Sequence, residues 1–412
     1  MEVFLAIVAV LVVVGGGIAI AVHHQRQKYI ASLTARGWTF IDRPDETAVY
    51  GLNCPPFGMG VNRRVDDQIV GHTSTGAAFQ AFEYDASTHR RAGYIAAVRL
   101  PRSLPEFYLL PHTAPRPGVA GVVVTQQGTH HVVAKDPDYA HKVLAAIVGT
   151  LGRYPAPPDL SIDHDQLVAV GAPKEAEALA AYLEALSATA RAIADAGALS
   201  SYLGPTPPPR LSLYERPDWE FRNRDDGMLA EVAYSGGGFD HTAEEVILSQ
   251  HPQLPFVSLL HRWKTQRTET YTDGQGNTRT RTVTDHHSER LLEYHPRFSF
   301  PDFKVNRGLM GNKVTFEWHE FNEAFTVRCR SPRLASDIFH PRMMEYLMER
   351  RPPGFEVDER GAISISLKAD DVASLMWGED FLLGFFARVP NFVWENLGYQ
   401  RPPVPPRQVS RG

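Results

Sequence analysis

The feature that most constrains the fold of this chain is a similarity between its two halves. The segment "WTFIDRPD" (38–45) resembles "WEFRNRDD" (219–226), and both place tryptophan, phenylalanine, arginine and aspartate at the same spacing. Farther along the chain, residues 135–170 align with residues 330–365 without a gap. Two matches in the same order predict two related domains, and 412 residues provide enough length for both.

The matched positions include the residues that start and stop a helix. Asp136-Pro137 in the first half faces Ser331-Pro332 in the second, and a pair of prolines later ends each segment. An oxygen-bearing side chain at the N-cap accepts a backbone N–H, and proline suits the next position because no N–H is needed there. We therefore expect one helix to begin at Pro137 and another at Pro332.

Beyond each proline pair, apolar residues alternate on either side of a polar turn, which Asp163 opens in the first half and Asp358 in the second. Such alternation predicts a β-hairpin with one buried face. A helix-forming segment follows each hairpin, at 173–197 and 370–394. Each half therefore reads as strands, a capped helix, a hairpin and a final helix, which is an α+β architecture.

Proline-rich segments mark the domain boundaries. Residues 201–216 contain "GPTPPPR" and predict a stiff linker, whereas residues 398–412 contain "RPPVPPR" and predict a disordered tail. We expect the first domain at 36–200. The second, which is longer because of an insertion in its middle, is expected at 217–397.

The N-terminus carries a long apolar run. Residues 3–22 contain no charged side chain, and a helix of that length, at about 1.5 Å per residue, spans roughly 30 Å, the hydrocarbon thickness of a bilayer. We expect a transmembrane anchor over residues 1–28, with membrane lipid as its partner. The small residues at 19–21 leave a cleaved signal peptide as an alternative. The predicted fold class is an N-terminal transmembrane helix followed by two related α+β domains, an internal duplication.

Charges beside the apolar run predict its orientation. Arg26, Lys28 and Arg36 follow the run, and no basic residue precedes it. Because basic residues tend to stay on the cytoplasmic side, we expect a single-pass protein of the cell membrane with the bulk of the chain in the cytoplasm. The presence of only two cysteines, Cys54 and Cys329, agrees with a reducing compartment.

The apolar N-terminus, the paired W-x-F segments and "FNEAFTVRCRSPRLA" (321–335) together resemble a family of bacterial, chiefly actinobacterial, single-pass membrane proteins of unknown function. The resemblance implies the same topology, one membrane span followed by a duplicated α+β domain, and it implies no catalytic residue. The first half departs from the pattern at "GTHHVVAKDPDYA" (128–140), where the Phe-Asn pair is missing.

Motifs that carry catalytic or cofactor chemistry are absent from the sequence. It contains no P-loop, no dinucleotide fingerprint, no G-x-S-x-G and no H-E-x-x-H. A net charge of −5 provides no overall electrostatic footprint for nucleic acid. We therefore expect no catalytic residue, no cofactor and no nucleic-acid partner.

Two groups in the second half invite a chemical interpretation. The densest histidine cluster consists of Asp285, His286, His287, His295 and His319. Adjacent residues on a strand point to opposite faces, so His286 and His287 do not converge on one ion, and we predict no metal site. Cys329 lies between two arginines, which favours a reactive thiolate. However, it shares a strand face with Phe325 and Val327, so we interpret it as a small core residue.

An insertion in the second half, "RWKTQRTETYTDGQGNTRTRTVTDHH" (262–287), has an unusual composition. Two threonine-rich segments flank turn residues at 273–277, which predicts a long hairpin that is polar on both faces and projects from its domain. Its basic residues are the predicted contacts with anionic lipid or with the acidic face of a protein partner. These residues are Lys264, Arg267, Arg279 and Arg281. The alternative interpretation is a solvated loop insertion.

These patterns together favour a membrane-anchored, non-enzymatic protein that binds a partner protein or organises a membrane site. The alternative is an enzyme with a pocket between the two domain copies.

Overall fold

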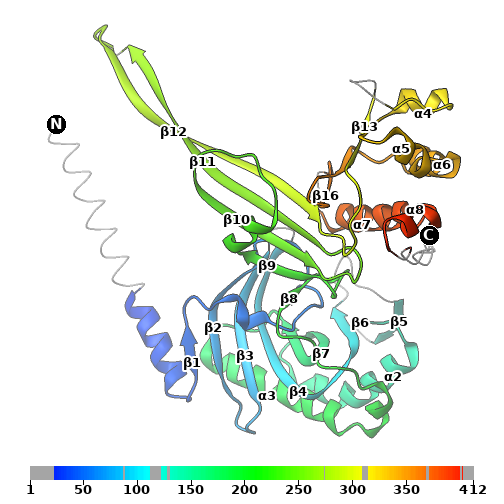
Figure 1. Ribbon diagram of the computed structural model, residues 1–412. Coiled ribbons are helices and arrows are strands. Elements are labelled where there is room, and N and C mark those ends of the chain that lie inside the picture. Colours follow the sequence, from blue (N-terminus) through cyan, green and yellow to red (C-terminus); the bar gives the residue numbers. More distant parts are fainter. Residues whose placement is uncertain are drawn as a thin grey trace. The chain divides into compact units, whose positions relative to one another are not determined.

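The chain forms two compact units in the computed structural model, Met1–Pro217 and Asp218–Gly412 (Figure 1). The structure describes residues 23–86, 89–111, 122–127, 130–272, 274–308, 314–367, 371–399 and 401. Each unit contains one β-sheet with helices packed on it, so the described chain is α+β.

The sheet of the first unit has seven strands in the order β1-β2-β3-β4-β6-β5, with β7 also paired to β4. The strands are β1 (Thr39–Ile41), β2 (Arg64–His72), β3 (Ala78–Ala86), β4 (His89–Pro111), β5 (Val122–Gln127), β6 (His130–Ala134) and β7 (Asp159–Val170). All of their pairings are antiparallel.

Helices cover this sheet and complete the first core. They are α2 (Pro137–Ile147), α3 (Ala176–Asp195) and the 3-10 segments η1 (Glu46–Val49), η2 (Val148–Arg153) and η3 (Gly197–Tyr202), and residues 23–34 are also helical. Along α3, Leu179, Leu183, Leu186 and Ile193 recur at helical spacing and are buried, so this face packs against β4. The helix predicted to begin at Pro137 is confirmed, and Asp136 caps it as expected.

The proline-rich segment at 201–216, which contains the short strand β8 (Leu211–Ser212), packs on the first unit. The Gly204 N–H donates to the Ser103 carbonyl over 2.9 Å, and the Gly51 N–H donates to the Arg210 carbonyl over 3.2 Å. Leu211 and Leu213 are buried. The segment is therefore held by specific contacts along its length.

The sheet of the second unit runs in the order β14-β13-β15-β16-β12-β11-β10-β9. Its strands are β9 (Glu220–Arg224), β10 (Phe239–Ser249), β11 (Phe256–Thr272), β12 (Thr278–Tyr294), β13 (Phe303–Arg307), β14 (Phe325–Cys329), β15 (Phe355–Val357) and β16 (Ile363–Ile365). Its helices are η4 (Asp226–Glu231), α4 (His319–Ala324), α5 (Pro332–Ile338), α6 (Pro341–Arg350), α7 (Val372–Phe386) and α8 (Asn391–Asn396). The helix predicted at Pro332 is confirmed as α5, with Ser331 as its cap.

Aromatic side chains fill the core of the second unit around α7. Phe385 stacks on Phe303 at a centroid distance of 5.7 Å, and Phe381 meets Phe355 edge-on at 5.2 Å. Large rings bury much apolar area per residue, which suits this part of the core, where α7 packs on the short strands β13 and β15.

The sequence matches between the halves fall on similar local structures. Trp38 precedes β1 and meets Phe79 edge-on at 5.0 Å, and Trp219 precedes β9 and meets Phe256 edge-on at 4.9 Å. The strand that follows each of these, β2 after β1 and β10 after β9, also carries a bulge. A residue with positive φ lies beside each bulge, Asp67 in β2 and Glu245 in β10. The predicted domain bounds, 36–200 and 217–397, stay predictions beside the two observed units.

One predicted hairpin is confirmed and the other is wrong. In the second unit β15 and β16 form the hairpin around Asp358. In the first unit the corresponding residues form one continuous strand, β7, that pairs with β4 on both sides of His164. The physical reason is that β4 continues past residue 100, so the two halves of β7 pair with β4 and not with each other.

The predicted membrane span requires a correction. Among the helices of the described residues, none combines the length and the apolar character needed to cross a bilayer. For the described residues, the expected fold class is therefore corrected to α+β with two sheets. Residues 3–22, on which the span was predicted, lie outside the described residues. The cytoplasmic orientation predicted from the charges beside that run stays a prediction.

Candidate functional site

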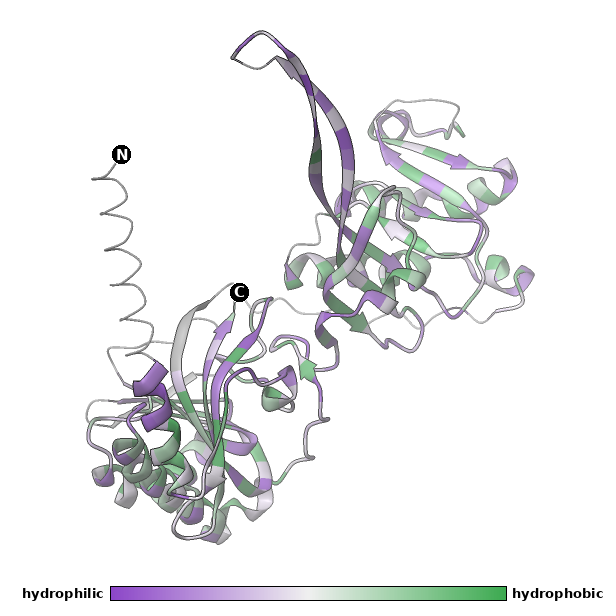
Figure 2. Ribbon diagram, turned by 90° about the vertical axis from the view of Figure 1, so that its left-hand side faces the viewer, coloured by the Kyte–Doolittle hydropathy of each residue, from purple (hydrophilic) through white to green (hydrophobic). Residues whose placement is uncertain are grey.

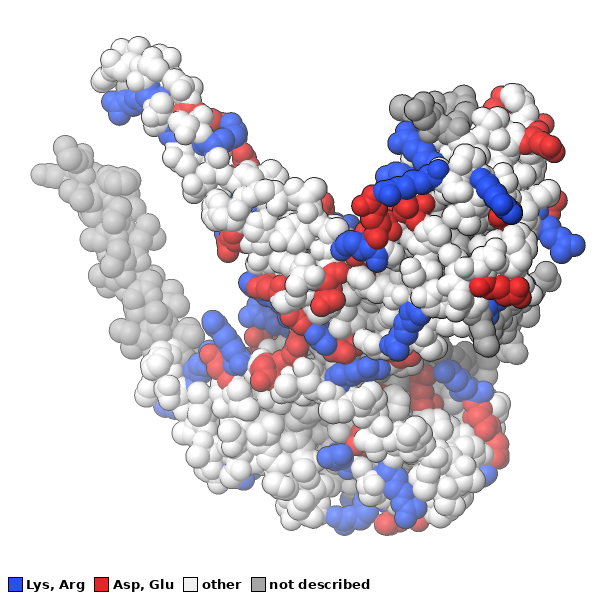
Figure 3. Space-filling model, in the orientation of Figure 1, with Lys and Arg blue, Asp and Glu red and all other residues white. Residues whose placement is uncertain are grey.

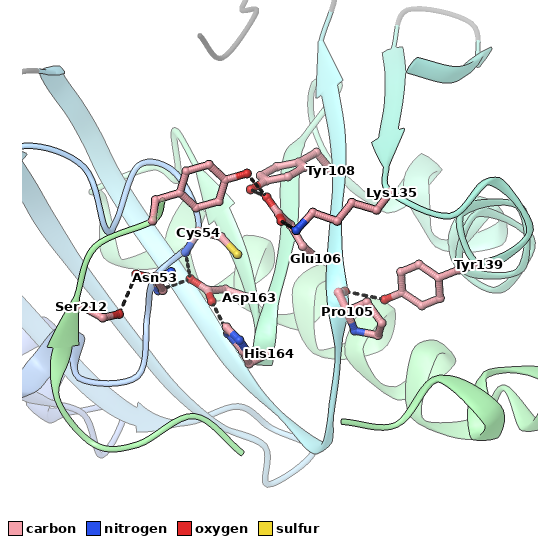
Figure 4. A network of polar contacts seen from close by, with 11 residues as sticks. Asn53, Cys54, Pro105, Glu106, Tyr108, Lys135, Tyr139, Asp163, His164 and Ser212 are labelled. Carbon is pink, nitrogen blue, oxygen red and sulfur yellow. Dashed lines mark hydrogen bonds and ion pairs between the residues drawn. The ribbon is translucent and has the colours of Figure 1, made fainter. Parts of the chain in front are cut away.

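A buried polar network in the first unit centres on Asp163 (Figure 4). Asp163, His164 and Asp165 interrupt the apolar residues of β7, and His164 has a φ of 56°, which kinks the strand. The kink places Asp163 inside the unit, where its side chain is fully buried. A buried carboxylate is costly unless donors surround it, so its partners define the site.

Two of those donors come from the loop at 51–58. One carboxylate oxygen of Asp163, Oδ2, accepts the backbone N–H groups of Asn53 and Cys54, each over 2.7 Å. The loop is tight because Gly58 has a φ of 70°, and a Cβ there would lie 2.2 Å from the Asn53 carbonyl. Ser212 closes the other side by donating from Oγ to Asn53 Oδ1 over 2.6 Å.

A second carboxylate, Glu106, lies across the network. Its Oε1 accepts the hydroxyl groups of Tyr108 and Tyr214, each over 2.5 Å, and its Oε2 lies 3.7 Å from Lys135 Nζ. The Lys135 side chain is 72% exposed, whereas that of Glu106 is 12% exposed. This lysine therefore screens the buried charge weakly.

The thiol of Cys54 lies between the two carboxylates (Figure 4). Burial, followed by the charges of Asp163 and Glu106, raises the pKa of Cys54 well above its usual range. His164 Nδ1 lies 2.8 Å from Asp163 Oδ1, and this hydrogen bond raises the pKa of the imidazole. The network thus combines a thiol, a carboxylate and an imidazole around one point.

His164 also opens the network to the outside. Its side chain is 36% exposed and lines a pocket of about 320 Å³. Asn53, Ser103 and Ser212 also line this pocket, together with residues 204–208. Sequence reasoning missed this site because Cys54 and Asp163 are far apart in the chain. The available signal was the polar triplet 163–165 inside an apolar strand.

The predicted contact residues of the second unit lie on a projecting two-stranded ribbon (Figure 1). The long hairpin is confirmed, because β11 and β12 pair without interruption from Phe256↔Tyr294 to Thr272↔Thr278. We call its outer part, residues 264–286, the arm. Figure 2 shows that the arm is largely hydrophilic. No hydrophobic core lies under its described residues, which are exposed or half-buried.

The register separates the arm into two faces, because residues directly opposite each other share a face. The threonine face consists of Gln266, Thr268, Thr270, Thr272, Thr278, Thr280, Thr282 and Thr284, all of them exposed. The charged face consists of Thr265, Arg267, Glu269, Tyr271, Arg279, Arg281, Val283 and Asp285. The structure therefore brings Arg267, Arg279 and Arg281 together and leaves Lys264 on the opposite side.

Acidic neighbours hold most of these basic side chains in place, and Figure 3 shows the two kinds of charge interleaved along the arm. Arg267 Nε lies 2.7 Å from Asp285, and Arg281 Nη2 lies 2.8 Å from Glu269. Lys264 pairs with Asp240 of β10 over 2.5 Å.

Stacked rings at the base of the arm support the charged face. His261 is fully buried. Its Nδ1 lies 3.0 Å from a carboxylate oxygen of Glu289, and its Nε2 lies 2.9 Å from Nδ1 of His241. Its ring stacks on Trp263 at 4.6 Å, and Trp263 in turn stacks on His287 at 5.2 Å. His286 lies on the other face and is exposed, so the predicted divergence of these neighbouring histidines is confirmed.

Cys329 lies at the end of β14, after the buried residues Phe325 and Val327. Partial burial raises the pKa of its thiol. It also lines an open pocket of about 570 Å³. The raised pKa opposes the reactive-thiolate interpretation. The prediction of a core residue is wrong, because the Cys329 side chain is only half-buried at the end of its strand.

Comparisons with known proteins place few constraints on this chain. No family model matches it, and no curated protein matches it. Among solved structures, it is similar to the crystal structure of the mycobacterial trehalose monomycolate transport factor A, TtfA. The two chains share 13% sequence identity with a TM-score of 0.33, over 44% of this chain and 97% of that one. A likeness this weak carries no argument about fold or function.

Proposed function

We propose that this protein is a non-enzymatic binding protein and that the charged face of its arm docks on an acidic surface of a protein partner. The observation that carries the proposal is the arm itself, a paired ribbon that extends beyond the sheet with both faces open (Figure 1). A two-stranded hairpin without a core is marginally stable by itself in water. Its length is therefore better explained by a contact than by the stability of the second unit.

The side chains of the charged face suit a protein interface. Arginine and tyrosine are enriched among the residues that dominate binding energy. Tyr271 is 43% exposed and lies directly opposite Arg279, and the guanidinium of Arg281 lies 5.7 Å from the Tyr271 ring centroid. Glu269 and Asp285 pair with Arg281 and Arg267 and orient their guanidinium groups, so carboxylates of a partner meet pre-oriented donors.

An anionic lipid surface is the other source of negative charge that the sequence suggested. Each basic residue near such a surface contributes about 1 kcal/mol. The arginines and Lys264 lie on opposite faces of the arm, so a flat membrane does not reach all four. This arrangement favours a protein partner.

The test uses the full chain in its native cell, with a photo-crosslinking amino acid in place of Tyr271. The double variant Arg279→Gln/Arg281→Gln changes only the charged face. The matched control, Arg333→Gln/Arg342→Gln, removes two exposed arginines from α5 and α6 of the same unit. We expect one dominant protein adduct that the arm variant loses and the control retains.

An adduct of equal abundance in both variants contradicts the role of the charged face. Arm-dependent, salt-sensitive binding to vesicles of anionic lipid, without a protein adduct, assigns the arm to a membrane surface instead. The alternative of an enzyme with a pocket between the two halves, and membership of the actinobacterial family that the sequence resembles, stay predictions.

A further inference from the structure

We propose that Cys54, Asp163 and His164 form a binding site for a divalent metal ion, and that Zn²⁺ is the ion their chemistry fits best. The Cys54 Sγ, a carboxylate oxygen of Asp163 and a ring nitrogen of His164 all lie within 4.8 Å of one another. Thiolate, imidazole and carboxylate are the ligand types that zinc binds in proteins. The first unit carries this site, so the proposal is independent of the arm.

The two oxygens of Asp163 have different partners, an arrangement that suits a metal ligand. Oδ2 accepts the N–H groups of Asn53 and Cys54 and thereby fixes the carboxylate. Oδ1 is hydrogen-bonded to His164 Nδ1 over 2.8 Å, and an ion bound by both side chains replaces this hydrogen bond. Backbone donors that orient a ligating carboxylate are the usual outer shell of a metal site.

Charge balance also favours a cation at this position. Asp163 is fully buried, Glu106 is largely buried, and the thiol of Cys54 lies between them. Among the described residues, the basic groups that contact these carboxylates are His164, which faces Asp163, and Lys135, whose side chain is mostly in solvent. The buried Arg63 donates to the Ser212 carbonyl instead. A divalent ion between the carboxylates compensates their charge and stabilises the thiolate form of Cys54.

The pocket beside His164 supplies a route and an open coordination position. The imidazole is partly exposed on the pocket wall, whereas Cys54 and Asp163 are buried behind it, so an ion from solvent meets His164 first. Three protein ligands and one position for water or another small ligand is the pattern of zinc sites that exchange ligands. When the ion binds, Cys54 releases its thiol proton to solvent, and the neutral His164 imidazole binds through a ring nitrogen that carries no proton.

The experiment titrates Co²⁺ and then Zn²⁺ into the purified full chain after treatment with a chelator. Cobalt bound to a thiolate shows a charge-transfer band in the near ultraviolet, so the readout reports the Cys54 sulfur directly. We expect one Co²⁺ per chain with this band, and stoichiometric displacement by Zn²⁺. The variant Cys54→Ala removes the band, and the matched control Cys329→Ala, which changes the other cysteine, retains it.

A second variant guards against misfolding. His164 has a positive φ, a conformation that asparagine tolerates well, so His164→Asn removes the imidazole with little backbone strain. We expect this variant to keep the fold and to lose at least about 10-fold in Zn²⁺ affinity, the smaller effect known for residues that only support a ligand. A band that survives in Cys54→Ala, or the absence of cobalt binding in the folded original chain, overturns the proposal. Unchanged affinity in His164→Asn also overturns it.

Discussion

Asp163 and Asp358 occupy matching positions in the two units, and each accepts two backbone N–H groups. Asp163 takes them from Asn53 and Cys54, in a loop far away in the sequence. Asp358 takes them from Arg360 and Ala362, in its own turn. The first carboxylate is fully buried, whereas the side chain of the second is 31% exposed.

The difference shows how one residue in similar strands acquires two roles. In the second unit the Asp358 carboxylate closes a hairpin between β15 and β16, which is a local function. In the first unit β7 is continuous, so the carboxylate is available to a distant loop and becomes the centre of a buried network. The packed neighbour therefore determines the chemistry of the position.

The largest expected effects come from the tryptophans at the start of each sheet. Replacing Trp38 or Trp219 with alanine removes a buried ring that packs on a phenylalanine, Phe79 or Phe256. We expect each change to lower the free energy of unfolding of its own unit by roughly 3–5 kcal/mol. Hydrogen exchange with mass spectrometry reads the two units separately. If just one of the two replacements lowers the free energy of unfolding by less than about 1 kcal/mol, the two tryptophans do not have equivalent roles in their units.

Asp163→Ala should lower the free energy of unfolding of its unit more than Asp358→Ala does. Without Asp163, two buried N–H groups lose their acceptor, and we expect a loss of about 3 kcal/mol from the first unit. Without Asp358, water replaces the carboxylate in an exposed turn, and we expect about 1 kcal/mol. The same exchange measurement checks both variants, and equal costs show that the burial of Asp163 has no energetic consequence.

Removal of the arm should change stability little. Residues 266–284 are replaced with Asn-Gly, the dipeptide that suits a two-residue hairpin turn. Because the arm has no core, we expect the free energy of unfolding of the second unit to change by less than about 1 kcal/mol, as for other surface changes. General loss of exchange protection in β10 and β12 after this replacement contradicts the view that the arm is an appendage.

The smallest expected effect concerns the ion pairs of the arm. Hydrogen bonds from Arg281 and then from Arg267 lower the pKa of Glu269 below its ordinary value of 4.5. The stabilisation of the folded arm by the charged Glu269 is therefore complete above pH 4.5. It is lost as the pH falls through the lower pKa that Glu269 has in the folded state. We expect faster amide exchange in the arm under acid conditions, beyond the intrinsic change, and no such pH dependence in Glu269→Gln. An identical profile in both chains shows that the pairs contribute nothing.

Local patterns predicted a large part of the observed fold. The caps at Asp136 and Ser331, the helices that follow them, and the long hairpin at 262–287 all depend on neighbouring residues and were predicted correctly. The hairpin predicted around Asp163 was wrong because the alternation of apolar residues does not reveal whether two segments pair with each other or with a third. The leading span was predicted from hydropathy alone, and the described helices do not supply it.

The arm and the site around Asp163 differ in how far local sequence patterns could predict them. The alternation of threonine and charge in the arm is a local pattern, so the sequence alone determined its hairpin and its four basic residues. Only pairing register decided that Arg267, Arg279 and Arg281 share a face and that Lys264 does not. The meeting of Cys54 with Asp163 depends entirely on tertiary structure, because a continuous β7 and a tight loop at 51–58 bring together residues that no sequence spacing connects.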